Sequence, residues 1–380
     1  MGKEIAGVDE WTSVFCSLNQ SQSQTQSVSL DESHNTSKHI FWNTSNPESK
    51  STHPVIQSAG AGWEHSLIVD DSGGLWVCGS NTHGQCGFPV TTKNIYTLQK
   101  LVSMASHHVI SVACGLRHSI ALTDTGEVYA WGCNKYGQLA HENQMTDSRC
   151  LSPTLLAFSS PSIVAIAAGC NHSVFLGSDN RVWTAGRNRF GQLARNPLLL
   201  KVSFFPILVE GLQVEVDPME EQRIQRNKEQ QKKEQDPQVD VEMLQNKGSL
   251  VKNEQTRVKS ILAGWHTTGI LLTTGKLILF GRNDRGQLHH PPSTPIWTPA
   301  IASTLPPLSQ ISAGAEHFLA LTTSNSVISW GWNEHGNCAV GHQRDLHHYQ
   351  AIELPNTAYQ PALVSCGYGF SMILCQKLIP

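Results

Sequence analysis

The chain has 380 residues and a formal net charge of −3 at pH 7. Its length allows a large buried core, and the small negative charge argues against a protein that binds nucleic acid through an overall basic surface. The sequence has no apolar stretch long enough to cross a membrane, and its first residues lack the apolar region of a secretory signal. The 10 cysteines are scattered and form no CxxC pair, which is typical of free thiols in a reducing compartment. We therefore expect a protein of the cytoplasm, the nucleus or both.

The first segments in chain order are expected to contribute little to the core. Residues 1–10 are predicted to form a flexible N-terminus, and residues 11–380 a single domain. At the start of this domain, residues 11–19 have the pattern of a degraded outer strand of a repeat unit. Residues 20–51 are rich in Gln, Ser and Asn, and this composition predicts a disordered, low-complexity loop.

After this loop, one pattern recurs five times along the chain. A glycine is followed three residues later by His or Thr, and fourteen residues after that by a second glycine, with an Asn and a further Gly soon after. The first glycine and the His or Thr of the copies are Gly62 and His65, Gly115 and His118, Gly169 and His172, Gly264 and Thr267, and Gly314 and His317. Repetition of β-rich units with a period of about fifty residues is typical of a β-propeller.

Each copy has the pattern of a β-hairpin. In the second copy, an apolar run from His118 to Thr123 is followed by turn residues 124–127 and by a second apolar run from Val128 to Trp131. The repeated glycines allow close backbone approach or a positive φ angle. We interpret the repeated His as a buried side chain that hydrogen-bonds between adjacent strands, and not as a metal ligand.

Two further segments complete the chain. Residues 215–255 separate the third and fourth copies, and their helix-favouring sequence of mixed charge fits either an exposed loop or a helical arm that grips a partner. Residues 364–374 resemble the first half of a unit, with Phe370 at the His position. Pairing of this half with residues 11–19 would complete a sixth unit and close the ring, which removes exposed sheet edges.

The second copy resembles the repeat of a known family. Its run Gly-Leu-Arg-His118-Ser, followed by Tyr-Ala-Trp131-Gly-Cys-Asn134-Lys-Tyr-Gly-Gln-Leu, closely resembles the repeat of the regulator-of-chromosome-condensation (RCC1-like) propellers. The resemblance implies an all-β propeller of seven blades. Six units are detectable here, so either the ring has six blades or a seventh has lost its pattern. A narrower resemblance, at residues 312–317 and 330–338, is to the secretion-regulating guanine nucleotide exchange factor and its fungal relatives.

Motifs for catalysis or cofactor binding are weak. Residues 269–277 resemble a phosphate-binding loop, but its two glycines are one residue too far apart and Leu277 replaces the magnesium-binding hydroxyl. Pairs of adjacent histidines, such as His289 and His290, are assigned to loops between units, where we expect His289 to be exposed. Adjacent side chains on an extended chain point apart, so such a pair is a poor metal site. We therefore expect no enzyme activity, no cofactor and no bound metal.

Two functions remain, and both require a partner protein. The first is a non-catalytic scaffold that docks another protein, and the second is a guanine nucleotide exchange factor for a small GTPase, as the family name implies. The narrower resemblance implies a partnership with the small zinc-binding electron carrier of diphthamide synthesis and tRNA wobble-uridine modification. We expect a monomer that binds neither membranes nor, directly, nucleic acid.

The candidate partner-binding residues are Trp332, Glu334 and His335. The other copies have Ser, Cys or Arg at the position of Trp332, and such a departure is expected where a repeat scaffold acquires a specific contact. The alternative is that Trp332 packs on the loop of a neighbouring blade. Trp63 and Trp265 occupy equivalent positions of copies that are not adjacent, and we interpret them as scattered core or interface residues.

Overall fold

The computed structural model of the protein describes residues 11–15, 55–141, 149–158, 162–212, 256–293, 295–354 and 359–377. In this part of the chain the regular structure is β-strand, apart from a short 3-10 turn at Val102–Met104. The segments predicted as a flexible N-terminus (1–10), a low-complexity loop (20–51) and a charged insertion (215–255) lie outside the described residues. The described part of the chain is therefore all-β, as predicted.

Each of the five repeat copies supplies one four-stranded antiparallel sheet. The first sheet contains β2 (Ile56–Ala61), β3 (His65–Asp70), β4 (Leu75–Ser80) and β5 (Asn94–Lys100). The second contains β6 (Val109–Cys114), β7 (His118–Thr123), β8 (Val128–Cys133) and β9 (Arg149–Leu155). The third contains β10 (Ile163–Ala168), β11 (His172–Gly177), β12 (Val182–Arg187) and β13 (Val202–Leu208). The fourth contains β14 (Val258–Ala263), β15 (Thr267–Leu272), β16 (Leu277–Gly281) and β17 (Ile296–Ile301), and the fifth contains β18 (Leu308–Ala313), β19 (His317–Thr322), β20 (Val327–Gly331) and β21 (Leu346–Ala351).

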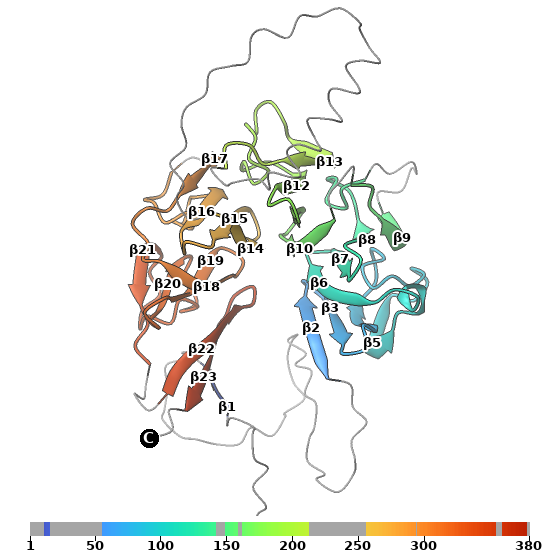
Figure 1. The fold of residues 1–380 in the computed structure, drawn as a ribbon, viewed down its shortest axis with the longest axis horizontal. Coiled ribbons are helices and arrows are strands. Elements are labelled where there is room, and N and C mark those ends of the chain that lie inside the picture. Colours follow the sequence, from blue (N-terminus) through green and yellow to red (C-terminus); the bar gives the residue numbers. More distant parts are fainter. Residues whose placement is uncertain are drawn as a thin grey trace, which may run out of the picture.

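A sixth sheet in the described part brings together strands from the two ends of the sequence. It contains β22 (Tyr359–Cys366), β23 (Ser371–Lys377) and β1 (Trp11–Phe15), in the order β1-β23-β22. β1 runs antiparallel to β23, with Trp11 opposite Gln376. Figure 1 shows the sheets arranged around a common centre, with the first strand of each repeat innermost and β1 beside β23.

The second strand of each repeat lies deep in the fold. Every residue of β7 and of β11 is buried, so these strands do not alternate between apolar and polar side chains. This pattern is expected of a strand that is covered on both faces by neighbouring sheets. β7 pairs with β8 through a turn in which Gly126 has a φ of 81°, and the hairpin predicted for the second copy is thereby confirmed.

The hydrophobic core is divided among the spaces between successive sheets. Trp131 of the second sheet packs with Leu67 and Val77 of the first, and Trp330 of the fifth sheet packs with Leu271 of the fourth. Equivalent clusters lie between the second and third, third and fourth, and fifth and sixth sheets. Since burial of apolar surface is favourable by about 25 cal/mol per Å², these clusters hold the sheets face to face.

A buried histidine also hydrogen-bonds one sheet to the next. Nε2 of His65 lies 2.9 Å from Oγ of Ser119, and Nε2 of His118 lies 3.1 Å from Oγ of Ser173. Ser119 donates its hydroxyl hydrogen to the backbone carbonyl of Gln85 at 2.7 Å. The serine must therefore accept from the histidine, and Nε2 carries the ring proton. The equivalent contacts further along the chain are His172 to Thr268 and His317 to Ser371.

The fourth copy departs from this pattern, and the next copy departs with it. Thr267 stands at the histidine position, and the fifth sheet has Phe318 where the hydroxyl acceptor would be. Phe318 is buried in the cluster between these two sheets and stacks on Trp330, with ring centroids 5.3 Å apart. An apolar side chain thus takes the place of the polar pair at this junction.

Candidate protein-binding face

One end of the set of sheets carries the loop between the first and second strands of every repeat. These loops, residues 62–64, 115–117, 169–171, 264–266, 314–316 and 367–370, define what we call the Gly-His face. Backbone hydrogen bonds pass from loop to loop around the centre: Leu116 N donates to Cys170 O, Cys170 N to Trp265 O, Trp265 N to Ala315 O, and Ala315 N to Tyr368 O. The residue directly after the first glycine of each copy therefore lies nearest the axis.

The first glycine of a copy is required by the histidine ring beside it. A Cβ added to Gly115 would lie 2.0 Å from Cε1 of His118 and 2.5 Å from the carbonyl oxygen of Gly169 in the next loop. Such distances lie far inside van der Waals contact, so only glycine allows the ring and the neighbouring loop to approach this closely. The Gly-x-x-His motif thus sets how tightly the loops converge on the axis.

Three aromatic side chains from different sheets meet at the centre of this face. The ring centroid of Trp63 lies 5.7 Å from that of Trp265 and 5.6 Å from that of Tyr368, and the last two are 5.6 Å apart. Trp63 is nevertheless 50% exposed. The interpretation of Trp63 and Trp265 as scattered residues is therefore wrong. Their copies are not adjacent in the sequence, but equivalent positions of all copies converge on the axis.

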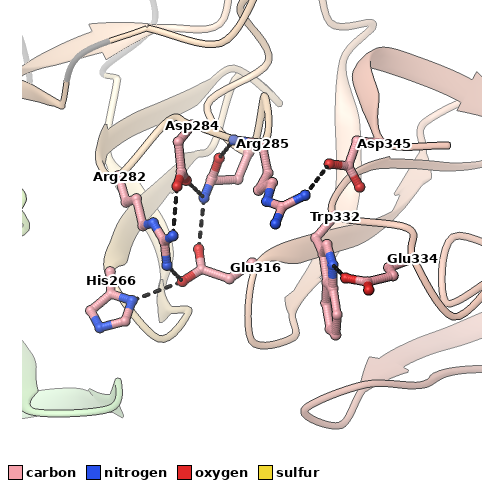
Figure 2. Close-up of polar contacts among 9 residues, drawn as sticks. His266, Arg282, Asp284, Arg285, Glu316, Trp332, Glu334 and Asp345 are labelled. Atoms are coloured by element: carbon pink, nitrogen blue, oxygen red, sulfur yellow. Dashed lines mark hydrogen bonds and ion pairs between the residues drawn. The ribbon is translucent and has the colours of Figure 1, made fainter.

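A buried carboxylate next to this axial aromatic cluster ties the fourth sheet to the fifth. Glu316 is 7% exposed, and its Oε1 accepts hydrogen bonds from Nδ1 of His266 at 2.7 Å and from Nη1 of Arg282 at 3.1 Å. Its Oε2 accepts from Nε2 of Gln287 at 2.7 Å. Figure 2 shows His266 and Arg282 converging on Glu316. Because a buried charge is tolerated only when it is paired, this network fixes the relative position of the two sheets.

Arg282 is held on its other side by Asp284. Nη2 of Arg282 lies 2.5 Å from Oδ2 of Asp284. Burial alone would lower the pKa of Arg282, but its hydrogen bond to Asp284 and the charge of Glu316 outweigh burial and raise that pKa. Burial would likewise raise the pKa of Asp284, but the hydrogen bond from Arg282 outweighs it and lowers that pKa. Both side chains are therefore charged at neutral pH.

The structure places the three predicted partner-binding residues together on the loop after β20. Nε1 of Trp332 donates to Oε2 of Glu334 at 3.1 Å, and the Trp332 ring meets the ring of His335 edge-on, with centroids 5.1 Å apart. Glu334 and His335 are exposed, and Trp332 is partly exposed. The backbone N–H of Trp332 donates to the carbonyl oxygen of Glu316, so this patch adjoins the buried network (Figure 2).

The expectation that His289 lies exposed in a loop between units is wrong. His289 is 2% exposed, its Nδ1 lies 3.0 Å from Oγ1 of Thr304, and its ring stacks on that of Tyr349. Its backbone has a φ of 59°, and the equivalent positions of the other copies also have positive φ; these are Gly87, Ala140, Ala194 and Ala339. His289 is therefore part of the repeat itself, three residues after the last glycine of the motif.

The segment that resembles a phosphate-binding loop is a strand and a turn. Gly269 lies within β15, and Gly275 lies in the turn between β15 and β16 with a φ of 80°. A Cβ added to Gly269 would lie 2.8 Å from the side chain of Leu262, so this glycine serves the packing of paired strands. Within the described ranges, no three His, Cys, Asp or Glu side chains are grouped so that they could hold a metal ion, and no helix is long and apolar enough to cross a bilayer.

Comparison with known proteins places these features in a family. The RCC1-like domain matches residues 15–373. The secretion-regulating guanine nucleotide exchange factor of Bos taurus is 28% identical over 350 residues, which cover 85% of this chain and 65% of that protein. An RCC1 repeat-containing protein of Schizosaccharomyces pombe is 27% identical over 351 residues, which cover 85% of this chain and 90% of that protein.

Solved structures give the same result for the fold. Yeast RCC1 (Prp20), from its crystal structure with Kap60, superposes with a TM-score of 0.62 at 19% identity over 85% of this chain and 81% of that chain. The fold is thus an RCC1-like β-propeller, and its sheets are called blades from here on. The chain belongs to the RCC1-like domain family. It spans 65% of the length of the bovine and mouse exchange factors that it matches.

Proposed function

We propose that this protein is a non-catalytic, protein-binding propeller whose partner docks on the Gly-His face. The observation that carries the proposal is Trp63, a half-exposed tryptophan at the centre of the face that is held in place by Trp265 and Tyr368. Rigid, central aromatic side chains supply a large share of the binding energy at protein interfaces. Trp332 and its neighbour Glu334 extend the same face outward and would make a second contact.

The partner we propose is the small zinc-binding electron carrier of diphthamide synthesis and tRNA wobble-uridine modification, for which this protein would be a regulatory subunit. The support is that residues 312–317 and 330–338 resemble the secretion-regulating guanine nucleotide exchange factor and its fungal relatives. This resemblance implies the partnership. Those two segments contain Glu316 and Trp332, which lie on the Gly-His face.

Calorimetric titration with the purified, zinc-loaded carrier tests this proposal. Trp63→Ala is expected to weaken binding about tenfold or more, which corresponds to about 1.4 kcal/mol. Lys276→Ala is the control, because Lys276 is exposed in the turn between β15 and β16 at the opposite end of the fourth blade. Absence of binding by the wild-type protein would overturn the proposed identity of the partner. Equal affinities of the two variants would overturn the proposal that the partner docks on the Gly-His face.

The alternative function, exchange of guanine nucleotide on a small GTPase, is supported by the names of the bovine and mouse relatives. Such an activity requires a segment that wedges into the GTPase and loosens GDP. Residues 215–255 are the candidate from sequence and lie outside the described residues. Release of fluorescent GDP from a panel of GTPases tests it: acceleration by the wild-type protein, lost on removal of this segment, would favour exchange.

We also propose that six blades form a closed ring, and that the protein is a monomer of the cytoplasm, the nucleus or both. The antiparallel pairing of β1 with β23 and the contact of Trp63 with Tyr368 support the closure. Val14 lies opposite Ile373 in this pairing, so Val14→Pro is expected to lower the melting temperature by interrupting the strand. An unchanged melting temperature would show that β1 does not complete the sixth blade.

A further inference from the structure

Cationic side chains stack on aromatic rings across neighbouring blades of the Gly-His face. The guanidinium carbon of Arg187 lies 4.5 Å from the ring centre of Tyr136, which belongs to the preceding blade. Phe190 is flanked in the same way by Arg189 at 5.3 Å and by Arg282 of the following blade at 5.2 Å. This arrangement follows from the repeat. Arg187 and Arg282 each follow the glycine at the end of the third strand, and this position lies against a loop of the preceding copy. Stacking orients the guanidinium planes before any ligand binds.

Charge is distributed unevenly over this face. On the fourth blade the arginines are neutralised: Arg282 by Glu316 and Asp284, and Arg285 by Asp345 at 3.0 Å (Figure 2). Several cations on the second and third blades have no carboxylate at ion-pair distance among the residues that the structure describes, and four of these lie in a loop between first and second strands or within two residues of the end of a third strand. They are Arg117, Lys135, Arg187 and Arg189, and we call them the basic surface.

Two members of the basic surface, Arg117 and Arg187, act on a common point near the axis. Burial and the charge of Glu316 raise the pKa of the Cys170 thiol to about 11, and the positive charges of Arg187 and Arg117 both oppose this rise. The backbones of these two arginines are hydrogen-bonded to adjacent loops, which fixes where their side chains begin. Arg117, Lys135 and Arg189 are exposed. Lys135 and Arg187 lie over the same ring, that of Tyr136, at 5.6 and 4.5 Å from its centre. Arg117, Lys135 and Arg187 therefore form one positively charged area, and Arg189 follows Arg187 by two residues.

We propose that the basic surface is a docking site for an acidic segment of a partner protein. The inference rests on the proposed function only in that a protein approaches the Gly-His face. Guanidinium groups bind carboxylates through paired N–H donors, and the stacking on Tyr136 and Phe190 reduces the conformational entropy lost on binding. A nucleic-acid strand fits this face poorly, because a phosphate backbone that continued onto the fourth and fifth blades would meet arginines that are already ion-paired and the exposed carboxylate of Glu334.

Fluorescence anisotropy with the full-length protein and short synthetic peptides tests the inference without the partner. The probes are a labelled peptide of alternating Glu and Ser, the same peptide with Gln in place of Glu, and a labelled single-stranded RNA of similar length. The Glu peptide is expected to bind, and its affinity should fall as salt screens the charges. No binding of the Glu peptide, or tighter binding of the RNA through the same residues, would overturn the inference.

Charge-reversal variants locate the binding. Arg187→Glu with Arg189→Glu is expected to weaken binding of the Glu peptide about tenfold or more, while Lys276→Glu at the opposite end of the propeller leaves it unchanged. Arg117→Glu is a second test, because Arg117 stacks on no ring among the described residues and its loss does not disturb the cation–aromatic contacts. Equal affinities for all variants would overturn the site. If the Glu peptide fails to bind while the zinc carrier still binds, the acidic-segment site is overturned and the proposed function is not.

Discussion

Nε2 of His118 lies 3.1 Å from Oγ of Ser173, and this hydrogen bond joins the second blade to the third. Ser173 donates in turn to the carbonyl oxygen of Gln138 at 2.6 Å, so one histidine orders a strand of the next blade and a loop of its own blade. His118 is completely buried, with no exposed surface. The integrity of this junction therefore depends on a neutral imidazole with its proton on Nε2.

Replacing His118 tests the weight of this contact. His118→Ala is expected to lower the free energy of unfolding by about 1–3 kcal/mol, because it leaves a buried hydroxyl without its donor. Urea denaturation measures the change. His335→Ala is the control, because His335 is exposed and the change there should stay within about 0.5 kcal/mol. Equal effects of the two changes would contradict the structural role of the buried histidine.

The same burial predicts a loss of stability in mild acid. Burial lowers the pKa of His65 and of His317 from 6.5 to about 4. The unfolded chain binds protons at higher pH than the native protein does, so stability is full above pH 6.5 and falls as the pH drops toward 4. Each such histidine contributes about 1.4 kcal/mol per pH unit within that window.

Urea titrations at several pH values within this window measure the slope. The variant His317→Gln should show a shallower dependence on pH than the wild-type protein, because one of the titrating groups is gone. An unchanged pH dependence in this variant would show that His317 does not contribute to the loss of stability in acid. A wild-type stability that does not change between pH 6.5 and 4 would contradict the prediction for all the buried histidines.

The Glu316 network gives a third prediction. Glu316→Ala is expected to lower the free energy of unfolding by about 3 kcal/mol, because it leaves Arg282 and His266 without their shared acceptor in a partly buried site. Glu334→Ala, in the exposed patch of the same blade, should cost less than about 0.5 kcal/mol. Thermal or urea unfolding of both variants checks the difference, and a cost at Glu316 no larger than at Glu334 would refute the role of the network.

The repeat and its hairpins could be predicted because they depend on neighbours within one copy. Gly115, His118 and the turn at Gly126 recur at fixed spacing, and each has a local physical reason. His289 was misassigned because a histidine at a left-handed position is unusual, although the small residues at the same place in other copies could have revealed it.

Contacts between copies were harder to predict. The meeting of Trp63, Trp265 and Tyr368 depends on how the fold brings loops that are distant in the sequence to one axis, which no spacing within a copy encodes. The pairing of Glu316 with Arg282 likewise joins single residues that are not part of the repeat pattern. The clustering could have been predicted from one feature of the sequence. Trp63, Trp265 and Tyr368 each follow the first glycine of a copy, and equivalent positions of a propeller lie at the same distance from its axis.

A fourth prediction concerns the charged insertion, which lies outside the described residues. The sequence predicts a surface segment between blades here, so deletion of residues 218–247 is expected to leave the melting temperature nearly unchanged, because the closure entropy of a long surface loop depends only weakly on its length. Differential scanning calorimetry of the deletion variant measures this. Failure of the variant to fold would show that the segment contributes a blade of its own.

The affinity of the zinc carrier for the double variant Trp332→Ala, Glu334→Lys tests the central claim most directly. We predict that binding weakens at least about tenfold, or about 1.4 kcal/mol, while the propeller keeps its wild-type melting temperature. The side-chain contacts of Trp332 with Glu334 and His335 lie within one loop, and the substitutions keep the backbone hydrogen bond to Glu316, so we expect the fold to be retained. Unchanged affinity in the folded double variant would contradict the claim that the partner docks across the Gly-His face at this patch.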